Sequence, residues 1–488
     1  MGAGLDLVVH GHFYQPPRED PWTGAVPQQP SAAPAHDWNE RITDECYRPC
    51  TAVEVVDADG QARSVNLFEH LSFNVGPTLL SWLEPHHPEV YAAILEADRR
   101  SGRAIAQAYG HAILPLCDDR DLRTQVRWGL ADFRHRFGRA PEGIWLPETA
   151  VSERVLAVVA EEGLRFTILA PGQLRAVRSL DGDGTWQDVT ADGVEPVRTD
   201  RAYRWCHPGR PDVGLDLVVY DGGLAHALAF GDPSSAAVLD WVQDHAVDGA
   251  GTCVAATDGE TFGHHHPGAE TTIALALVVE AAARGVGTPR LAELLERRPP
   301  THQAVVRTSA WSCAHGVGRW MHDCGCHTGG DPAWSQSWRE PLRNALDELR
   351  HWAVGVMDRR GTELLGDPWL ARDAYVDVVI GARTYEDFAG QHVLDPAGAA
   401  DARTLLEAQR HGLLMYTSCG WFFNDLAGLE TVQILRYAAR SMDLYRELGE
   451  EPPVEAFLAE LSRARSNDPT KGDGRQIWVD QVDGSRPA

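Results

Sequence analysis

The first half of the chain alternates short apolar runs with stretches of helical periodicity. The runs are rich in β-branched residues, most are apolar on both faces, and each ends in a polar cluster, as buried parallel strands do. Between two of them, Ser152 is a candidate helix N-cap and Gly163 a candidate stop for an apolar-periodic segment. The runs cover residues 5–9, 104–109, 143–146, 166–169, 215–220 and 252–257. The pattern predicts repeated strand–helix units.

Reactive side chains follow five of these six runs. In a parallel barrel the carboxyl ends of the strands meet at one face, where loops from several strands build the active site. A dinucleotide-binding sheet would need a glycine fingerprint after its first strand, and the sequence has none. The side chains are His10, His12, His111, Glu148, Asp221 and Asp258. The sequence therefore predicts an α/β fold built as a (β/α) barrel with its chemistry at one end.

The repeating pattern has two interruptions and one clear limit. Residues 20–64 and 175–212 are rich in turn-forming residues and are expected to be long loops or hairpin insertions. Beyond about residue 300 the apolar positions recur at helical spacing, and from Ser466 onward the chain is polar and expected to be loosely held. We therefore expect a barrel catalytic domain over residues 1–300 and an α-helical domain over 301–488.

The charge balance narrows the choice of partner. The chain has 70 acidic and 44 basic side chains and a formal net charge of −26, which would repel nucleic acid and anionic membranes. A neutral substrate fits better, and the 16 tryptophans suit the apolar faces of sugars, although core packing is their commonest role. No apolar stretch is long enough to cross a bilayer, and nine scattered cysteines indicate reduced thiols. We expect a soluble cytoplasmic protein whose oligomeric state the sequence leaves open.

Two carboxylates stand at the ends of separate predicted strands. Glu148 directly follows Pro147, which restricts the backbone before it, but a glutamate there also suits the start of a helix. Asp258 precedes a glycine, which is equally typical of an ordinary turn. Taken together with the histidines nearby, the pair matches what glycosidases need, since one carboxylate attacks the sugar and the other protonates the leaving oxygen.

Four segments resemble the motifs of glycoside hydrolase family 57 in order and spacing. The third contains Glu148, at the position of the family's nucleophile, and the fourth begins at Asp258, at the position of its acid/base. The segments are HGHFYQP at 10–16, GHAILPL at 110–116, WLPE at 145–148 and DGETFGH at 258–264. The resemblance covers roughly the first 270 residues.

This resemblance implies an incomplete (β/α)7 barrel followed by a helical region, and a retaining mechanism without a cofactor. It also implies an α-glucan substrate with α-1,4 or α-1,6 bonds, although the family includes an α-galactosidase branch. The third and fourth motifs look most like branching enzymes, but Phe13 and Tyr14 are inserted before Gln-Pro in the first, so that activity is not transferred. The substrate-binding residues implied by the motifs and strand ends are His10, His12, Gln15, His111, Trp145, Asp221, Glu260 and His264.

The second half resembles an uncharacterised helical domain that is fused to some family members, mainly over residues 311–320 and 417–425. In the family the helical region closes over the barrel mouth and supplies an aromatic side chain to the cleft. Trp311, Trp320 or Trp421 are the candidates here. The alternative is that these rings only cement the domain interface.

Two places in the sequence could bind a metal. His10 and His12 alternate on one strand end, but the family's pattern assigns them to the sugar subsite. The cluster of His315, His322, Cys324, Cys326 and His327 lacks the Cys-x-x-Cys or His-x-x-x-His spacing typical of closed tetrahedral sites, so we assign no metal.

Two other functions stay open. The first is a metal-dependent polysaccharide deacetylase on a similar barrel, in which His10, His12 and an aspartate bind the metal. The second is a catalytically silent glucan-binding protein.

Overall fold

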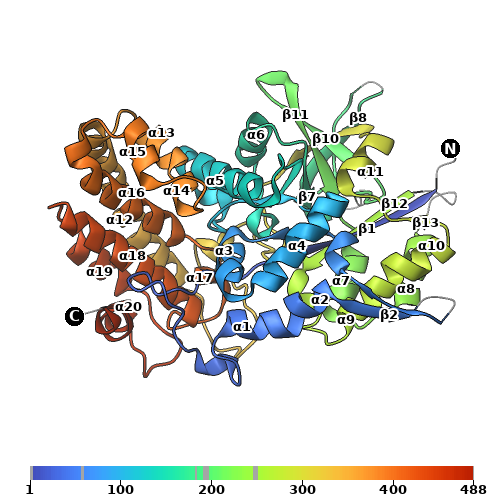
Figure 1. The fold of residues 1–488 in the computed structure, drawn as a ribbon, viewed down its shortest axis with the longest axis horizontal. Helices are drawn as coiled ribbons and strands as arrows, with labels where there is room; N and C mark the ends of the chain where they lie inside the picture. The colour runs from blue at the N-terminus through green and yellow to red at the C-terminus, as the bar shows by residue number, and fades with distance from the viewer. Residues whose placement is uncertain (1–3, 57–59, 182–183, 191–196, 246–250, 487–488) are drawn as a thin grey trace. The chain divides into compact units, whose positions relative to one another are not determined.

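The computed structural model describes residues 4–56, 60–181, 184–190, 197–245 and 251–486, and Figure 1 shows their elements. The chain forms two compact units. The first unit comprises Met1–Gln15, Gln28–Ala108 and Arg136–Trp311. The second comprises Pro16–Pro27, Tyr109–His135 and Ser312–Ala488. Two segments of the N-terminal half thus belong to the helical unit. The expected division at residue 300 does not include them there.

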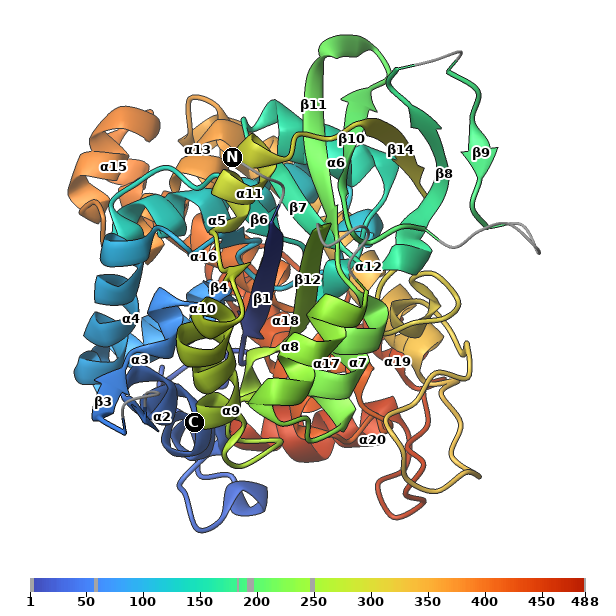
Figure 2. The same ribbon diagram turned by 90° about the vertical axis from the view of Figure 1, so that its right-hand side faces the viewer.

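Seven strands of the first unit run parallel, and their order in space is the same as their order in the sequence. A ladder joins β1 to β12, as Figure 2 shows, and β1 also pairs with β4. Phe73 of β4 bridges Ala104 just before β5, and β5, β6, β7 and β11 then pair in turn. One main-chain bond of 2.6 Å, from Asp221 N to Val254 O, links the end of β11 to β12. The strands are β1 (Leu5–Phe13), β4 (Ser72–Val75), β5 (Ala106–Gln107), β6 (Gly143–Trp145), β7 (Phe166–Leu169), β11 (Arg210–Val219) and β12 (Gly251–Asp258).

All six apolar runs fall on these strands, whereas β4 was missed. Its Ser72 and Asn74 are polar, so the segment does not look like a buried strand, yet all four of its residues are buried. Figure 2 shows helices around these strands, as in repeated strand–helix units. The helices of this unit are α1 (Trp38–Ile42), α2 (Arg48–Thr51), α3 (Pro77–His86), α4 (Pro88–Ser101), α6 (Glu153–Glu161), α7 (Gly222–Phe230), α8 (Ser235–Asp244), α9 (Ala269–Leu275), α10 (Ala281–Ala283) and α11 (Leu291–Arg297).

Helix α6 begins and ends where the sequence indicates. Ser152 Oγ accepts a hydrogen bond from Val155 N at 3.3 Å, and Gly163 takes a left-handed φ of 85° just past the helix.

The two insertions form hairpins as expected. The insertion over 20–64 contains all but the last residue of the β2–β3 hairpin. The described part of 175–212 contains most of β8, all of β10 and the start of β11, with which β10 pairs in a hairpin. The remaining strands are β2 (Val53–Val56), β3 (Ala62–Val65), β8 (Leu174–Ser179), β9 (Gln187–Asp188), β10 (Ala202–His207), β13 (Val286–Gly287) and β14 (His302–Val306).

The second unit is helical, as the periodicity predicts. Tyr109, Trp128 and the inner faces of α16 and α18 contribute to its apolar core. Its helices are α5 (Asp119–Phe137, whose last two residues belong to the first unit), α12 (Arg339–Leu364), α13 (Pro368–Ala374), α14 (Val376–Val379), α15 (Tyr385–His392), α16 (Ala399–Leu414), α17 (Cys419–Phe422), α18 (Leu429–Glu447), α19 (Val454–Leu461) and α20 (Gly474–Ile477). No helix among the described residues is long and apolar enough to span a membrane.

The polar C-terminal tail is held more firmly than its composition indicates. Asp425 accepts hydrogen bonds from Ser466 Oγ and from the main-chain N–H of Asn467. Trp478 is buried and packs edge-on against Phe457, with ring centroids 5.0 Å apart. The expectation of a loose tail is therefore wrong, because one buried indole anchors a segment that is otherwise polar.

Candidate active site

Glu148 lies in a strained turn at the end of β6. Pro147 opens a 3₁₀ turn, and the main chain then adopts left-handed φ angles of 57° at Glu148 and 47° at Thr149. Two successive non-glycine residues in this region, one of them β-branched, are rare and cost about 1–3 kcal/mol each. Hydrogen bonds from Thr149 N to Leu146 O and from Ala150 N to Pro147 O close the turn. Strain held by surrounding contacts is typical of functional sites.

Trp311 secures this turn from another part of the first unit. Its main-chain N–H contacts both Glu148 O, at 3.0 Å, and Thr149 Oγ1, at 3.1 Å. Its indole Nε1–H donates to Glu148 Oε2 at 3.1 Å. The sequence predicts Trp311 as an aromatic from the helical region, but it belongs to the first unit and hydrogen-bonds directly to the predicted nucleophile.

Asp258 ends β12, opposite His12 in the β1–β12 ladder. Surrounding protein displaces water from its carboxyl group, and this desolvation, followed by the negative charges of Glu260 and Glu148, raises its pKa well above the usual range. Asp258 is nonetheless exposed to solvent, and water reduces the size of this pKa shift. The effect of the Glu148 charge on Asp258 means that the two predicted catalytic carboxylates act on each other electrostatically.

Glu260 is held by the N-terminal segments. Its Oε1 accepts hydrogen bonds from Tyr14 N at 3.0 Å and from Tyr47 Oη at 2.5 Å. Burial raises the pKa of Glu260 to about 7, although these hydrogen bonds act in the opposite direction. The carboxyl group that the sequence assigns to substrate binding is therefore engaged with protein, and it influences Asp258 through its charge.

A chain of hydrogen bonds orders the two histidines of β1. Burial lowers the pKa of His10 to about 3, so His10 is neutral. Its Nε2–H donates to Asn74 Oδ1 at 3.1 Å, and its Nδ1 accepts from Ser72 Oγ at 2.9 Å. Asn74 Nδ2 donates to His12 Nδ1 at 2.9 Å and to Gln107 Oε1 at 2.6 Å. Because His12 Nδ1 accepts this hydrogen bond, the donor nitrogen of the His12 ring is Nε2.

This arrangement bears on the deacetylase alternative. Both ring nitrogens of His10 form hydrogen bonds within the protein, so His10 would have to give up one of them to bind a metal. The alternative, which requires that ligand, gains no support from the structure.

Trp145 underlies both histidines. Its ring stacks on His10 and on His12 with centroids 4.9 Å apart in each case, and it meets Trp311 edge-on at 5.0 Å. Two buried N–H donors here, Trp145 Nε1 and Gln107 Nε2, have no hydrogen-bond partner among the described residues. Buried donors without partners are costly, and unsatisfied groups of this kind are uncommon in folded proteins.

Three further predicted residues have distinct surroundings. Gln15 is buried and donates from Nε2 to Tyr14 O, while His264 Nδ1 contacts Glu45 Oε2 at 2.5 Å. Asp221 Oδ1 accepts from Leu224 N and so caps helix α7.

The position of Asp221 favours this capping role. Its main chain contacts β12 at Val254, four residues and about 13 Å along the strand before Asp258.

His111, Trp320 and Trp421 belong to the second unit. His111 has a left-handed φ of 53°, its Nδ1 lies 2.7 Å from Ser418 Oγ, and burial lowers its pKa to about 3. Both indoles are buried and donate to main-chain carbonyls of the same unit, Trp320 to Ser418 and Trp421 to Arg339. A role for these three in substrate binding stays a prediction.

Four residues that sequence reasoning missed contribute to the site. Asn74 and Gln107 connect to the histidines, Tyr47 holds Glu260, and burial together with the Asp258 charge raises the pKa of Tyr220 to about 12. Tyr220 is the last residue of a predicted strand, so its position in the sequence could have indicated it. The position of Asn74 gave no such indication, because the strand that contains it was missed.

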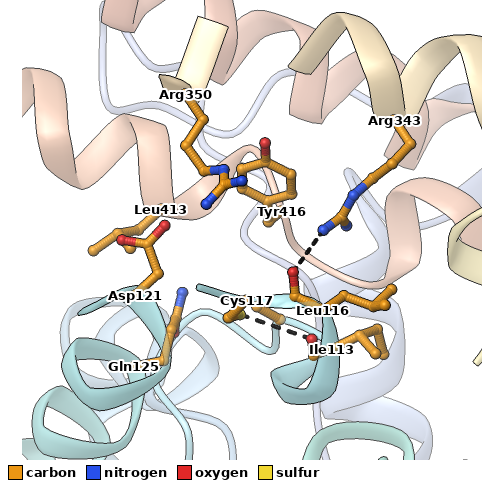
Figure 3. A pocket seen from close by; sticks show the side chains of 10 residues that line it. Ile113, Leu116, Cys117, Asp121, Gln125, Arg343, Arg350, Leu413 and Tyr416 are labelled. Atoms are coloured by element: carbon orange, nitrogen blue, oxygen red, sulfur yellow. Dashed lines mark hydrogen bonds between the residues drawn. The ribbon is translucent and has the colours of Figure 1, made fainter. Parts of the chain in front are cut away.

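The second unit contains a separate small cavity, shown in Figure 3. Arg343 and Arg350 enter it from α12, opposite Asp121 and Gln125 of α5. Its volume of about 10 Å³ suits at most one water molecule and is far too small for a sugar. The cavity is therefore part of the core of this unit rather than a substrate site.

Comparison of the sequence with models of known protein families identifies the family of this chain. Residues 9–300 match the model of glycosyl hydrolase family 57. The chain belongs to this family. Its members are glycosidases and transglycosidases. Residues 334–487 match a second model, a domain of unknown function (DUF3536).

Solved structures of similar fold include three α-glucan enzymes. An exo-type maltose-forming amylase from Pyrococcus sp. ST04 has a TM-score of 0.73 and 15% identity, covering 98% of this chain and 88% of that one. A branching enzyme from Thermococcus kodakaraensis has a TM-score of 0.54 and 16% identity, covering 95% of each chain. A 4-α-glucanotransferase from Thermococcus litoralis has a TM-score of 0.55 and 13% identity, covering 91% of this chain and 60% of that one. At these identities the likeness shows the fold, which is mixed α/β with a C-terminal helical region.

One curated relative also matches a short stretch. Alpha-amylase 1 of Dictyoglomus thermophilum is 28% identical over 92 residues. The match spans 19% of this chain and 13% of the amylase.

Proposed function

We propose that this protein is a retaining glycoside hydrolase or transglycosidase acting on α-glucans, with Glu148 as nucleophile and Asp258 as general acid/base. The observation that carries the proposal is the pair itself. Glu148 is strained and hydrogen-bonded at the end of β6, and its charge acts on Asp258 at the end of β12. Family membership supports the reaction class, and the printed activities of the similar amylase, branching enzyme and glucanotransferase support the choice of α-glucan.

The mechanism follows from the two carboxyl groups. A Glu148 oxygen attacks the anomeric carbon, the glycosidic C–O bond breaks, and protonated Asp258 gives its proton to the departing oxygen. In the second step Asp258, now a carboxylate, takes a proton from water or a sugar hydroxyl. That oxygen attacks the anomeric carbon, and the bond to Glu148 breaks.

The raised pKa of Asp258 suits both steps. Before attack, the charges of Glu260 and Glu148 favour protonated Asp258, which is the form that can donate. Once Glu148 forms an ester it loses its charge, so the pKa of Asp258 falls and the carboxylate becomes available as a base. The electrostatic coupling therefore changes the role of Asp258 at the moment when the mechanism needs it.

We propose that the region around β1 binds the sugar hydroxyls. His12, which Asn74 orients, and Trp145, whose ring meets Trp311 edge-on, would line the sugar subsite beside Glu148. His10, Gln15, Glu260 and His264 then support these side chains and the surrounding loops through hydrogen bonds to protein. For Asp221 we propose the capping role instead of sugar contact.

We further propose that the seven parallel strands form an incomplete (β/α)7 barrel. Their chain-order pairing supports this, and the single bond between Asp221 and Val254 would mark the incompletely closed edge. The barrel would be the catalytic domain, with the helical domain following from about residue 300. None of the nine cysteines forms a disulfide, and we propose a cytoplasmic location on this basis.

The proposal is tested by product analysis on amylose, amylopectin and maltoheptaose. Shorter sugars with new reducing ends mean hydrolysis, longer oligosaccharides mean transfer, and new branch points mean branching. Glu148→Gln is expected to abolish turnover while circular dichroism and the Tm stay unchanged. Retained activity in that variant would contradict the assignment, and binding of malto-oligosaccharide without any product would favour the silent glucan-binding alternative.

A further inference from the structure

The segment over residues 312–338 of the second unit has almost no regular secondary structure. Its single element is a short 3₁₀ helix, Gly318–Trp320, within 27 residues of turns and bends. Trp320 and Trp338 are nevertheless buried at 0% and 1% exposure. Long connections of this kind are uncommon in compact domains, and an ordered one needs something that fastens it. We therefore expect a cross-link between side chains to hold this segment in place.

Four side chains of this segment converge on one point. Their ligand atoms, three Sγ and one imidazole nitrogen, all lie within 4.8 Å of one another. The Sγ of Cys313 lies 3.9 Å from that of Cys324 and 3.8 Å from that of Cys326, and Cys326 Sγ lies 3.5 Å from His315 Nδ1. Disulfide sulfurs would be separated by about 2.05 Å, so these are separate thiols.

These separations agree with a tetrahedral zinc site. With Zn–S bonds of about 2.3 Å and Zn–N bonds of about 2.0–2.1 Å, tetrahedral angles place two sulfurs about 3.8 Å apart and a sulfur and nitrogen about 3.5–3.6 Å apart. The three separations given above fall within about 0.1 Å of these values. Simple clustering of polar groups does not require this match.

The backbone is shaped to present the ligands in two pairs. Cys313 and His315 form a Cys-x-His pair, and Cys324 and Cys326 form a Cys-x-Cys pair. In the second pair Gly325 takes a left-handed φ of 77°, and its N–H donates to Asp323 Oδ1 at 3.1 Å. This tight turn brings both sulfurs to the same side.

Outer contacts support the cluster. Main-chain N–H groups of Ala314 and Cys326 donate to the sulfurs of Cys326 and Cys324, respectively. Arg339 is fully buried, and its Nη1–H donates to Cys326 O at 2.8 Å. Hydrogen bonds around the ligands and a nearby positive charge are the surroundings expected for a thiolate-rich metal site.

We propose that Cys313, His315, Cys324 and Cys326 bind one structural zinc ion that fastens residues 312–338. Thiolate and imidazole ligands suit zinc, and four protein ligands leave no open position for chemistry. The site is independent of the glycosidase mechanism. Sequence reasoning set this cluster aside because both ligand pairs are separated by a single residue and because it did not include Cys313.

Elemental analysis of the full-length protein tests the proposal. Protein purified under reducing conditions without chelator and dialysed against metal-free buffer is expected to hold about one zinc ion per chain. Cobalt substituted for zinc is expected to give the thiolate charge-transfer band and the strong d–d bands of a tetrahedral site. Wild-type protein that binds neither zinc after reconstitution nor cobalt in this form would overturn the proposal, and so would a disulfide among these cysteines in reduced protein.

Matched variants locate the metal. Cys326→Ser and His315→Ala are expected to lose bound zinc at least about tenfold, whereas Cys206→Ser, in the first unit, is expected to retain it. A chelator is expected to lower the Tm of the wild type and of the control variant. Undiminished zinc in Cys326→Ser, or its loss in Cys206→Ser, would overturn the ligand assignment. The zinc and cobalt measurements on the wild type need neither a variant nor enzymatic activity. They therefore test the zinc site even if a variant fails to fold or the glycosidase proposal is wrong.

Discussion

Replacing Trp311 with phenylalanine isolates one hydrogen bond at the predicted nucleophile. The change removes Nε1–H, which donates to Glu148 Oε2 at 3.1 Å, and keeps an aromatic ring beside Trp145. The main-chain bonds from residue 311 to the Glu148 turn do not depend on the side chain, so the strained backbone is expected to persist. The variant therefore tests orientation of the carboxylate apart from formation of the turn.

The size of the effect follows from the charge on the acceptor. A hydrogen bond to a charged group contributes about 1.5–3 kcal/mol. If most of that energy orients Glu148 for attack, kcat falls about 10- to 100-fold, since about 1.4 kcal/mol corresponds to a factor of ten. KM is expected to change little, because the ring remains in place. The Tm is expected to fall by only a few degrees.

The assay is steady-state kinetics on maltoheptaose, with the Tm measured on the same preparations. Trp186→Phe is the control, because Trp186 is partly exposed in the first unit and hydrogen-bonds to no described catalytic residue. A kcat within about twofold of wild type at unchanged Tm would refute the reasoning, because the bond would then contribute little to orientation. An increase in KM with kcat intact would instead indicate that Trp311 serves as a platform for sugar.

Two other changes probe the electrostatics and the histidine network. Glu260→Gln removes a charge that raises the pKa of Asp258, so the alkaline limb of the kcat/KM profile is expected to move to lower pH. An unmoved limb would argue against the electrostatic coupling between Glu260 and Asp258. Because the pKa of buried Glu260 is raised to about 7, its contribution to stability is present below about pH 4.5 and is lost as pH rises through about 7. The same variant should therefore show a shallower fall in Tm over that range, and an equal slope would contradict the assignment. Asn74→Ala removes the shared partner of His10, His12 and Gln107. It is expected to lower kcat/KM at least about tenfold, with a loss of about 1–3 kcal/mol in stability. Ser72→Ala, which removes a hydrogen bond to His10, should have a smaller effect, and equal effects of the two variants would count against a role for His12 orientation.

The sequence predicts the elements that carry strong periodic patterns. Continuous apolar runs mark six of the seven parallel strands, and Ser152 and Gly163 mark both ends of α6. The missed strand β4 carries Ser72 and Asn74, whose polar side chains are buried only because they bind His10 and His12. Such a strand follows from tertiary partners, which local pattern does not contain.

The candidate active site was likewise predicted in part, where local sequence carries the signal, and missed where it depends on distant contacts. Glu148 and Asp258 were identified from their position after strands and from motif order. The contact of Trp311 with Glu148 joins residues 163 apart in sequence, and the main-chain N–H of Trp311 donates to Glu148 O within the left-handed turn. The convergence of Cys313 with Cys324 and Cys326 likewise depends on how an irregular segment folds back on itself. Long-range geometry of this kind has no local periodicity to reveal it.

The central claim is that Glu148 forms a covalent bond to the sugar. A 5-fluoro-α-glucosyl fluoride, which reacts and then releases slowly, is incubated with the protein, and peptides are analysed by mass spectrometry. The account predicts that the peptide containing Glu148 gains the mass of one fluoroglucosyl group, and that Glu148→Gln shows no such gain. A label on a different carboxylate, or turnover of this substrate with no adduct and with inversion at the anomeric carbon, would contradict it.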